Sequence, residues 1–196
     1  MCGIFGFVAD HSRADGECLI EIDHGLACIR HRGPDGTDKW VSSNGLVGFG
    51  HVRLSIVDLE AGAQPMHSDD RRYTIIYNGE VYNYIELRAE LGEELFRTHS
   101  DTEVVLRAFE RWGSGCLSRL RGMFAIAIWD SVEQKLFLAR DRFGIKPLYW
   151  ANTPNGLYFA SEVKALLPFL KRKAVNNSAL SDYFTFQFCL GEKTKI

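Results

Sequence analysis

The hydrophobic positions along this chain follow two periods, one typical of strands and one typical of helices. Apolar runs bounded by turn residues predict strands at 3–8, 38–42, 46–52, 73–77, 123–129, 135–140, 147–151 and 157–160. Apolar residues at helical spacing predict helices over 17–31, 82–91 and 178–188. A further helix is expected after Ser100, because Ser100-x-x-Glu103 is a capping box that precedes apolar positions at helical spacing. The Asn-Gly pairs at 44–45, 78–79 and 155–156 predict turns.

The strand predicted at 123–129 decides the fold class. Its side chains are apolar at every position, whereas a sheet with one face in water would alternate apolar and polar residues. Both faces of this strand must therefore be covered. The predicted helices also lie between groups of strands and do not follow each strand, which argues against a doubly wound parallel sheet. We expect an α+β fold in which two sheets pack together with helices outside.

Composition and charge narrow the classes of function. The chain has 196 residues, of which 46% are hydrophobic, and a formal net charge of −2, so nucleic-acid and anionic-membrane partners are not indicated. No apolar stretch reaches the roughly 18 residues of a membrane span, and the N-terminus lacks the layout of a signal peptide. The five cysteines contain no Cys-x-x-Cys pair and the six histidines show no ligand spacing. We therefore expect no disulfides, no metal site and a reducing cytoplasmic setting.

Cys2 is the first candidate for chemistry. If Met1 is removed, the new first residue carries a thiol and a free α-amine on the same carbon. An α-amine titrates near about 7.7–8.0, so it can serve as a base close to neutral pH for the neighbouring thiol. The alternative interpretation is a small buried apolar cysteine, and from this residue alone that alternative is favoured.

Seven short segments, in this order along the chain, make the nucleophile interpretation of Cys2 the favoured one. They lie at residues 2–6, 31–36, 50–58, 77–83, 100–103, 139–149 and 159–166. Together they closely resemble the N-terminal glutaminase domain of the glutamine-hydrolysing asparagine synthetase family. That domain is a class II glutamine amidotransferase, one of the N-terminal-nucleophile hydrolases. The resemblance covers about residues 2–190, and the ordered set is specific although each segment alone would be weak.

The resemblance implies a four-layer sandwich of two antiparallel sheets between helices, with the glutaminase domain at 2–170. It implies hydrolysis of L-glutamine to L-glutamate and ammonia, which passes through a tunnel to a synthetase domain in cis. Residues 171–196 are then a junction toward that domain, or a docking tail, because no Ser-Gly-Gly-x-Asp-Ser segment occurs in this sequence. ATP and Mg²⁺ are expected only for the synthetase domain, and no cofactor is expected here. A homodimer is one option for the assembly state.

Three catalytic residues follow from the resemblance. Cys2 becomes the nucleophile, with its α-amine taking the thiol proton and returning it to departing ammonia. Asn78 and Gly79 match the oxyanion hole, in which a side-chain amide and a backbone N–H face the oxygen that gains charge. The structural alternative for Asn78-Gly79 is a type I′ turn, and both roles can hold for Gly79.

The remaining matched residues would bind glutamine. Arg53 matches the group that binds the α-carboxylate in a two-pronged fork, with a strand-edge arginine as its alternative. Asp101 matches the partner of the α-ammonium and Glu80 lies next to it, whereas a carboxylate in the first turn of a helix is the alternative for Asp101. The pocket wall is expected to include Leu54, Ser55, Ile56 and Val57.

Some features receive no role in the active site. Residues 32–36 are explained as a turn and residues 140–142 as a buried ion network. His51 is interpreted as a packed structural histidine, although its neighbours also allow a place beside a pocket. Two other functions stay open, namely the same glutaminase feeding a different acceptor and a non-catalytic docking module of the same fold.

Overall fold

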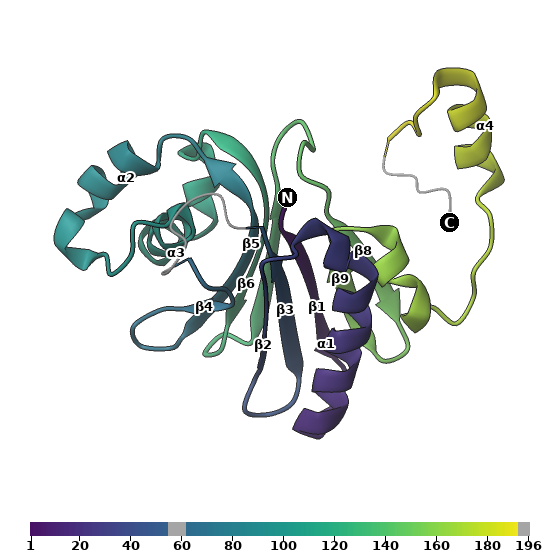
Figure 1. The fold of residues 1–196 in the computed structure, drawn as a ribbon, viewed down its shortest axis with the longest axis horizontal. Coiled ribbons are helices and arrows are strands. Elements are labelled where there is room, and N and C mark those ends of the chain that lie inside the picture. The colour runs from purple at the N-terminus through teal and green to yellow at the C-terminus, as the bar shows by residue number, and fades with distance from the viewer. Residues whose placement is uncertain (55–61, 192–196) are drawn as a thin grey trace.

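Two antiparallel sheets pack face to face in the computed structural model, which describes residues 1–54 and 62–191 (Figure 1). The first sheet has the strand order β2 (Gly36–Val41), β3 (Val47–Arg53), β1 (Gly3–Ala9), β9 (Gly156–Ala160) and β8 (Tyr149–Thr153). The second has the order β4 (Met66–His67), β5 (Tyr73–Val81), β6 (Gly122–Asp130) and β7 (Lys135–Arg140). All described strand pairs are antiparallel. None of the described helices is long and apolar enough to cross a membrane.

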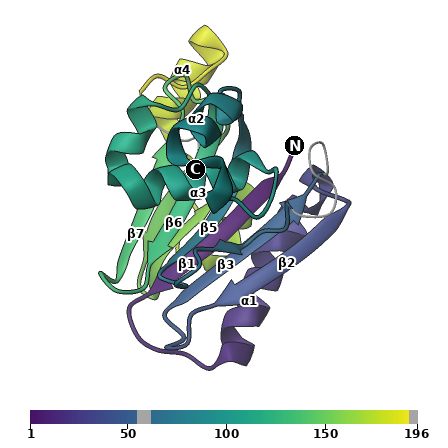
Figure 2. The same ribbon diagram turned by 90° about the vertical axis from the view of Figure 1, so that its left-hand side faces the viewer.

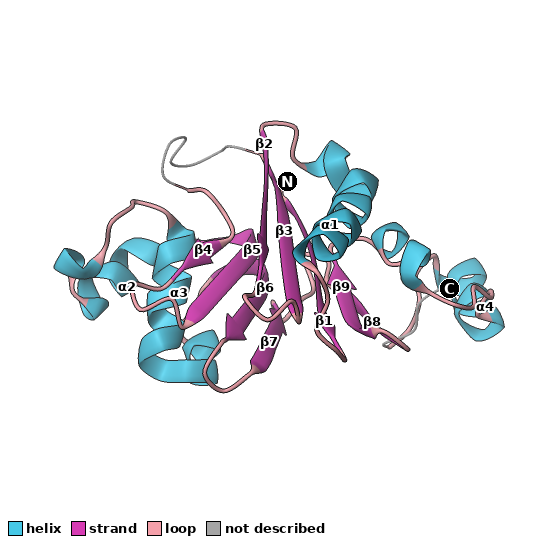
Figure 3. Ribbon diagram, turned by 90° about the horizontal axis from the view of Figure 1, so that it is seen from below, coloured by secondary structure: helices cyan, strands magenta, loops and turns pink. Residues whose placement is uncertain are grey.

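Helices cover the outer face of each sheet, which gives four layers (Figure 3). Helix α1 (Asp15–Ile29) lies on the first sheet, and α2 (Tyr84–Leu91) and α3 (Asp101–Trp112) lie on the second. Seen from the side of the second sheet, α2 and α3 lie in front of β5 and β6, and α1 lies behind β3 (Figure 2). Short 3₁₀ turns occur at Arg30–Arg32, Glu93–Leu95, Gly113–Ser118, Val163–Ala165 and Leu167–Phe169. The predicted α+β class and its four-layer arrangement are confirmed.

Successive side chains of each strand point to opposite faces of its sheet, so the buried side chains form three layers. In β1, Phe5 and Phe7 pack against α1, whereas Ile4 faces the second sheet. In β6, Ala125 faces the first sheet, and Ile126 packs under α3. Each fully buried large side chain of this kind contributes roughly 1.5–3 kcal/mol from area removed from water. The apolar run at 123–129 is therefore apolar on both faces because a sheet covers one face and helices cover the other.

Most predicted elements are confirmed within one or two residues, but β5 is longer than expected. The Asn78-Gly79 pair does not end the strand, because the pairing continues from Asn78↔Ala125 and Gly79↔Phe124 to Val81↔Gly122. A Cβ atom at position 79 would lie 2.5 Å from the carbonyl oxygen of Met123. Glycine is therefore needed here for close approach of two strands, and the turn interpretation is wrong.

The predicted capping box at α3 is wrong in its partners, although the helix itself is confirmed. Ser100 Oγ accepts from the backbone N–H of Thr102 at 3.1 Å. The Glu103 carboxylate accepts from the backbone N–H groups of Arg97 and Thr98, at 3.0 and 2.7 Å for the shortest contacts. It therefore organises the segment before the helix, and Ser100 N–H bonds to Thr98 Oγ1 at 3.2 Å.

Candidate active site

Cys2 immediately precedes β1, the central strand of the first sheet. Because β1 pairs with β3 on one side and β9 on the other, the backbone that follows Cys2 is held on both edges. The thiol lies beside Leu54 at the end of β3, with Sγ 3.4 Å from the Leu54 nitrogen and 3.6 Å from its carbonyl oxygen. The side chain is half-buried and free of any disulfide. A thiol placed in this way is accessible yet fixed in position.

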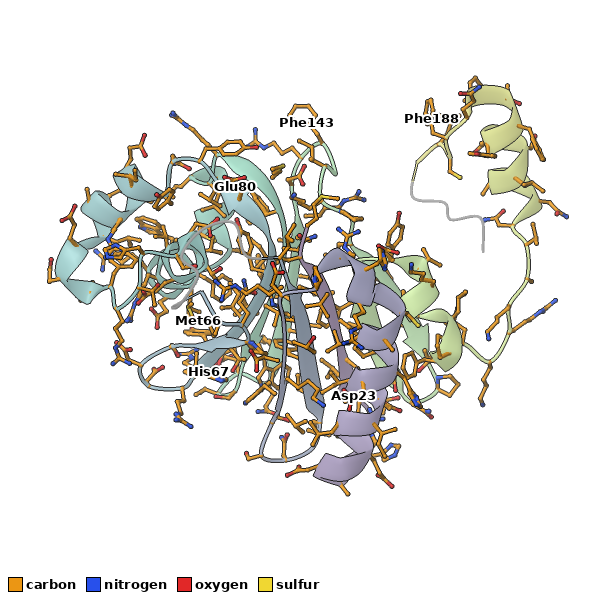
Figure 4. All side chains as sticks on the ribbon, viewed as in Figure 1. Asp23, Met66, His67, Glu80, Phe143 and Phe188 are labelled. Atoms are coloured by element: carbon orange, nitrogen blue, oxygen red, sulfur yellow. The ribbon has the colours of Figure 1, made fainter. Side chains whose placement is uncertain are left out.

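A cavity of about 520 Å³ opens next to Cys2. Its walls come from the start of β1, the ends of β3 and β5, the start of α3 and the loop after β7. In Figure 1 these ends meet near the N-terminus, and Figure 4 shows Glu80 at the same end of the molecule. Both sheets therefore contribute to one site, and the volume suits a small molecule.

Asn78 supplies a buried polar group to this cavity. Its side chain is 1% exposed and its Nδ2 has no hydrogen-bond partner among the described residues. An unpaired buried amide donor costs free energy unless a bound molecule satisfies it. Gly79 follows it on β5 and also lines the cavity. The structure thus brings Cys2, Asn78 and Gly79 to one cavity, and their catalytic roles stay predictions.

The charged residues expected to bind substrate also reach the cavity. Arg53 ends β3, Glu80 is exposed near the end of β5, and Asp101 begins α3. Asp101 Oδ2 accepts from the Tyr77 hydroxyl at 2.8 Å and from the Val81 N–H at 3.0 Å. Burial raises the pKa of Asp101 although these two hydrogen bonds oppose the shift. A bound cation would therefore stabilise the charge of this carboxylate.

The expected pocket wall is described only in part. Leu54 lines the cavity. Ser55, Ile56 and Val57 lie outside the described residues, so their expected places are not tested. Among residues 1–54 and 62–191, no group of three or more His, Cys, Asp and Glu side chains is placed to hold a metal ion.

Two residues that received no role from the sequence lie against the site. His51 lines the cavity, is 2% exposed and has no partner for Nε2 among the described residues. Arg32 donates from Nε to the carbonyl oxygen of Cys2 at 3.0 Å, so the turn at 32–36 does not fully explain this segment. The place of Arg32 among the seven matched segments was the signal that could have identified it.

The segment at 140–142 differs from the ion network that was expected. The Asp141 carboxylate accepts from four backbone N–H groups, those of Phe124, Phe143, Ile145 and Lys146. Arg140 donates to backbone carbonyls of the same loop, including that of Lys146 at 2.7 Å. In the described part of the chain these side chains bind backbone and not each other. The network instead holds the loop that brings Ile145 and Lys146 to the cavity.

Comparison with known proteins identifies the family. A family profile described as a glutamine amidotransferase domain matches residues 1–196. The chain belongs to the glutamine amidotransferase family. This amidotransferase domain is 45% identical over 193 residues to asparagine synthetase [glutamine-hydrolyzing] 1 of Bacillus subtilis, covering 96% of this chain and 30% of that protein. It is 42% identical over 179 residues to amidase chry2 of Gibberella zeae, covering 86% of this chain and 27% of that protein.

Solved structures agree with the fold of this amidotransferase domain. The glutamine phosphoribosylpyrophosphate amidotransferase of Bacillus subtilis, complexed with ADP and GMP, superposes with a TM-score of 0.69 at 25% identity. The match covers 84% of this chain and 43% of the other. The expected fold of N-terminal-nucleophile amidotransferases is thereby confirmed. The chain spans about 30% of the length of its asparagine synthetase relatives.

Proposed function

We propose that this domain hydrolyses L-glutamine to L-glutamate and ammonia, with Cys2 as nucleophile after removal of Met1. One observation carries the proposal: the Cys2 thiol borders a cavity that is also lined by Asn78, whose buried Nδ2 has no hydrogen-bond partner in the described part of the chain. Arg53 and Asp101 at the same cavity add one cation and one carboxylate. Free glutamine has the complementary groups, namely a carboxamide, an α-carboxylate and an α-ammonium.

In the first half-reaction the α-amine of Cys2 takes the thiol proton, and the sulfur attacks the carboxamide carbon. Asn78 Nδ2 and the Gly79 N–H would donate to the oxygen that becomes negative. Each such donor contributes on the order of 2.7–4 kcal/mol where it has been measured in other enzymes. The carbon–nitrogen bond then breaks, the amine returns its proton to the leaving nitrogen, and ammonia departs from a thioester on Cys2.

In the second half-reaction water hydrolyses the thioester. The α-amine of Cys2 accepts a proton from water as the oxygen attacks the thioester carbon, and the same oxyanion donors act again. Carbon–sulfur cleavage releases glutamate, and the proton returns to the thiolate. One residue thus supplies nucleophile and base, so no cofactor is needed for this step.

The acceptor of the ammonia is proposed from the relatives of this chain. Because this chain is similar to asparagine synthetases of which it covers 30% and 24%, we propose an ATP- and Mg²⁺-dependent synthetase domain in cis that makes asparagine. A second candidate keeps the glutaminase and changes the acceptor, and the similarity to amidase chry2 favours it. We place the protein in a reducing cytoplasm because all five cysteines are free. A homodimer stays a prediction.

The deciding experiment compares the natural protein with Cys2→Ala. We expect glutamate release to fall to background in Cys2→Ala, while the thermal midpoint changes little because the side chain is only half-buried. Mass spectrometry of the active protein should find Cys2 as the first residue. Glutaminase activity in Cys2→Ala would exclude the nucleophile, and activity in protein that retains Met1 would exclude the α-amine as base.

A further inference from the structure

Glu162 is the second residue after β9, and its carboxylate has three partners, an arginine, a lysine and a histidine. Its Oε1 is 2.9 Å from Arg32 Nη1 and 2.9 Å from His31 Nε2, and its Oε2 is 3.0 Å from Lys164 Nζ. Burial alone would raise the pKa of Glu162, but the hydrogen bonds from Arg32, Lys164 and His31 outweigh it and lower the pKa to about 2. The carboxylate is therefore ionised throughout the physiological pH range.

Arg32 connects this carboxylate to the proposed nucleophile. Its side chain is only 9% exposed, and Nε donates to the Cys2 carbonyl oxygen at 3.0 Å while Nη1 donates to Glu162. The guanidinium is planar and rigid, so fixing Nη1 on the carboxylate also fixes the direction of Nε–H. Without Glu162 this buried guanidinium would lose its counter-charge. An unpaired buried charge is costly, so the Arg32 side chain would reorient toward solvent.

The residue before Glu162 holds the same stretch of chain from the other side. Ser161 Oγ accepts from the Ile4 N–H at 3.0 Å, and the Ser161 N–H donates to the Ile4 carbonyl at 2.9 Å. Ser161 is fully buried. Two consecutive residues after β9 thus hold residue 4 directly and residue 2 through Arg32, which defines where the first residues of the chain lie.

We propose that Glu162 is a positioning residue for Cys2, acting through Arg32 to hold the backbone of the nucleophile beside the substrate cavity. The inference rests on the proposed glutaminase function, and it assigns Glu162 no contact with substrate. Arg53, Asp101 and Asn78, which would bind glutamine, come from β3, α3 and β5 and not from the segment after β9. Loss of Glu162 should therefore affect the chemical step more than glutamine binding.

The main test is the kinetics of Glu162→Gln. This change keeps the shape of the side chain and removes the charge that orients Arg32. We expect kcat to fall roughly 10- to 100-fold, the scale on which misplacement by about 1 Å acts, with KM for glutamine within about 2-fold of the natural protein. The matched control is Glu133→Gln, which removes a carboxylate from the exposed ion pair with Lys135 and should leave both constants unchanged.

A double-mutant cycle with Arg32→Met asks whether Glu162 acts through Arg32. If it does, adding Glu162→Gln to Arg32→Met lowers kcat little further. A full additional loss of kcat in the double variant would overturn the proposed route. An unchanged kcat in Glu162→Gln, or a rise in KM that accounts for the whole loss of activity, would overturn the inference itself.

Two further variants separate the possible failures. If Glu162→Gln does not fold, Glu162→Asp keeps the charge but shortens its reach, and a kcat equal to that of the natural protein would contradict a positioning role. Cys2→Ala is measured in the same series. Activity in Cys2→Ala overturns the proposed function, and the inference with it, whereas an inactive Cys2→Ala beside a fully active Glu162→Gln overturns the inference alone.

Discussion

At the scale of single residues, His51 connects the two sheets next to the proposed active site. It lies on β3, and its ring donates a hydrogen bond to the backbone of Tyr77, the residue before Asn78 on β5. Burial, and next the nearby Arg53 guanidinium, lower the pKa of His51 from its ordinary 6.5 to about 4. The ring is therefore neutral in the folded protein at neutral pH, so His51 is both a packed histidine and a wall of the cavity.

This lowered pKa predicts a specific loss of stability in acid. Between pH 6.5 and about 4 the unfolded chain protonates His51 and the folded protein does not, so acid favours unfolding. The stabilisation is complete above pH 6.5 and is lost progressively as the pH falls to about 4. The loss amounts to about 3 kcal/mol by linkage. Urea unfolding at a series of pH values should show a steeper acid decline in the natural protein than in His51→Gln.

The control for this experiment removes a different imidazole. His24 lies on α1 with an exposed side chain, so His24→Gln should keep the acid decline of the natural protein. A His51→Gln variant with the same decline between pH 6.5 and 4 would show that the buried ring is not responsible.

The sequence could not predict the role of residues whose contact partners lie far away along the chain. Cys2, Asn78 and Arg53 each lie in a short segment whose residue types could be matched one by one, and the structure brings them to one cavity. Arg32 also lies in a matched segment, but its contact could not be predicted from that segment because its partner Glu162 is 130 residues away along the chain. A contact of that kind follows from the pairing of β1 with β9, which no local pattern contains.

At the scale of elements, Gly25 shows how α1 is fitted to its sheet. It is buried in the middle of the helix, and a Cβ atom there would lie 2.4 Å from two ring atoms of Phe5. Phe5 is fully buried in β1 and has little freedom to move. Glycine is thus required by the close approach of helix and strand, although glycine normally weakens a helix.

We therefore expect Gly25→Ala to destabilise the protein by about 1–3 kcal/mol through overpacking, despite the better helix propensity of alanine. For a chain of this size the thermal midpoint should fall by roughly 2–4 °C per kcal/mol. Gly16 in the first turn of the same helix is the matched control, since a Cβ atom there meets nothing within 4 Å. Gly16→Ala should be neutral or stabilising by up to about 1 kcal/mol. Equal midpoints for the two variants would contradict the packing argument.

The elements were predictable where local pattern and tertiary pairing agree. The hairpin at Asn44-Gly45 is such a case, since Gly45 has a φ of 65° and the strands on both sides are those expected. The same dipeptide at Asn78-Gly79 led to a wrong turn prediction, because the pairing of β5 with β6 overrides the turn preference of these residues. The local sequence gave no sign that a strand of the other half of the chain would pair across this position.

At the scale of the whole molecule, the site exists because the two sheets meet at one end. Cys2 and Arg53 come from the first sheet, whereas Asn78 and Glu80 come from the second. The interface between the sheets is filled by buried side chains such as Ile4, Phe49 and Ile76. The sequence predicted both layers, but the way in which their ends come together depends on this packing.

The segment after the 3₁₀ turn Leu167–Phe169 stands apart from this body. It contains α4 (Asn177–Phe186), which extends away from both sheets in Figure 1 and again in Figure 3. Its cap is local, with Asn176 Oδ1 accepting from the Ala179 N–H at 3.2 Å. Phe184 is 77% exposed and Phe188 is 59% exposed, and Figure 4 shows Phe188 beyond the body of the domain.

These features predict that the domain is complete at residue 170, the boundary expected from the sequence. A chain ended at Leu170 should unfold within about 2 °C of the longer chain, because the removed segment extends away from the sheets and its loss exposes little buried surface. It should also release glutamate with unchanged kcat and KM, since no residue of 171–191 lines the cavity.

Calorimetry and a glutamate assay on both chains test this, with a chain ended at Thr153, which lacks β9, as the unfolded reference. A thermal midpoint lowered by more than about 5 °C would mean that 171–191 stabilises the sandwich, and the boundary would then lie farther along the chain.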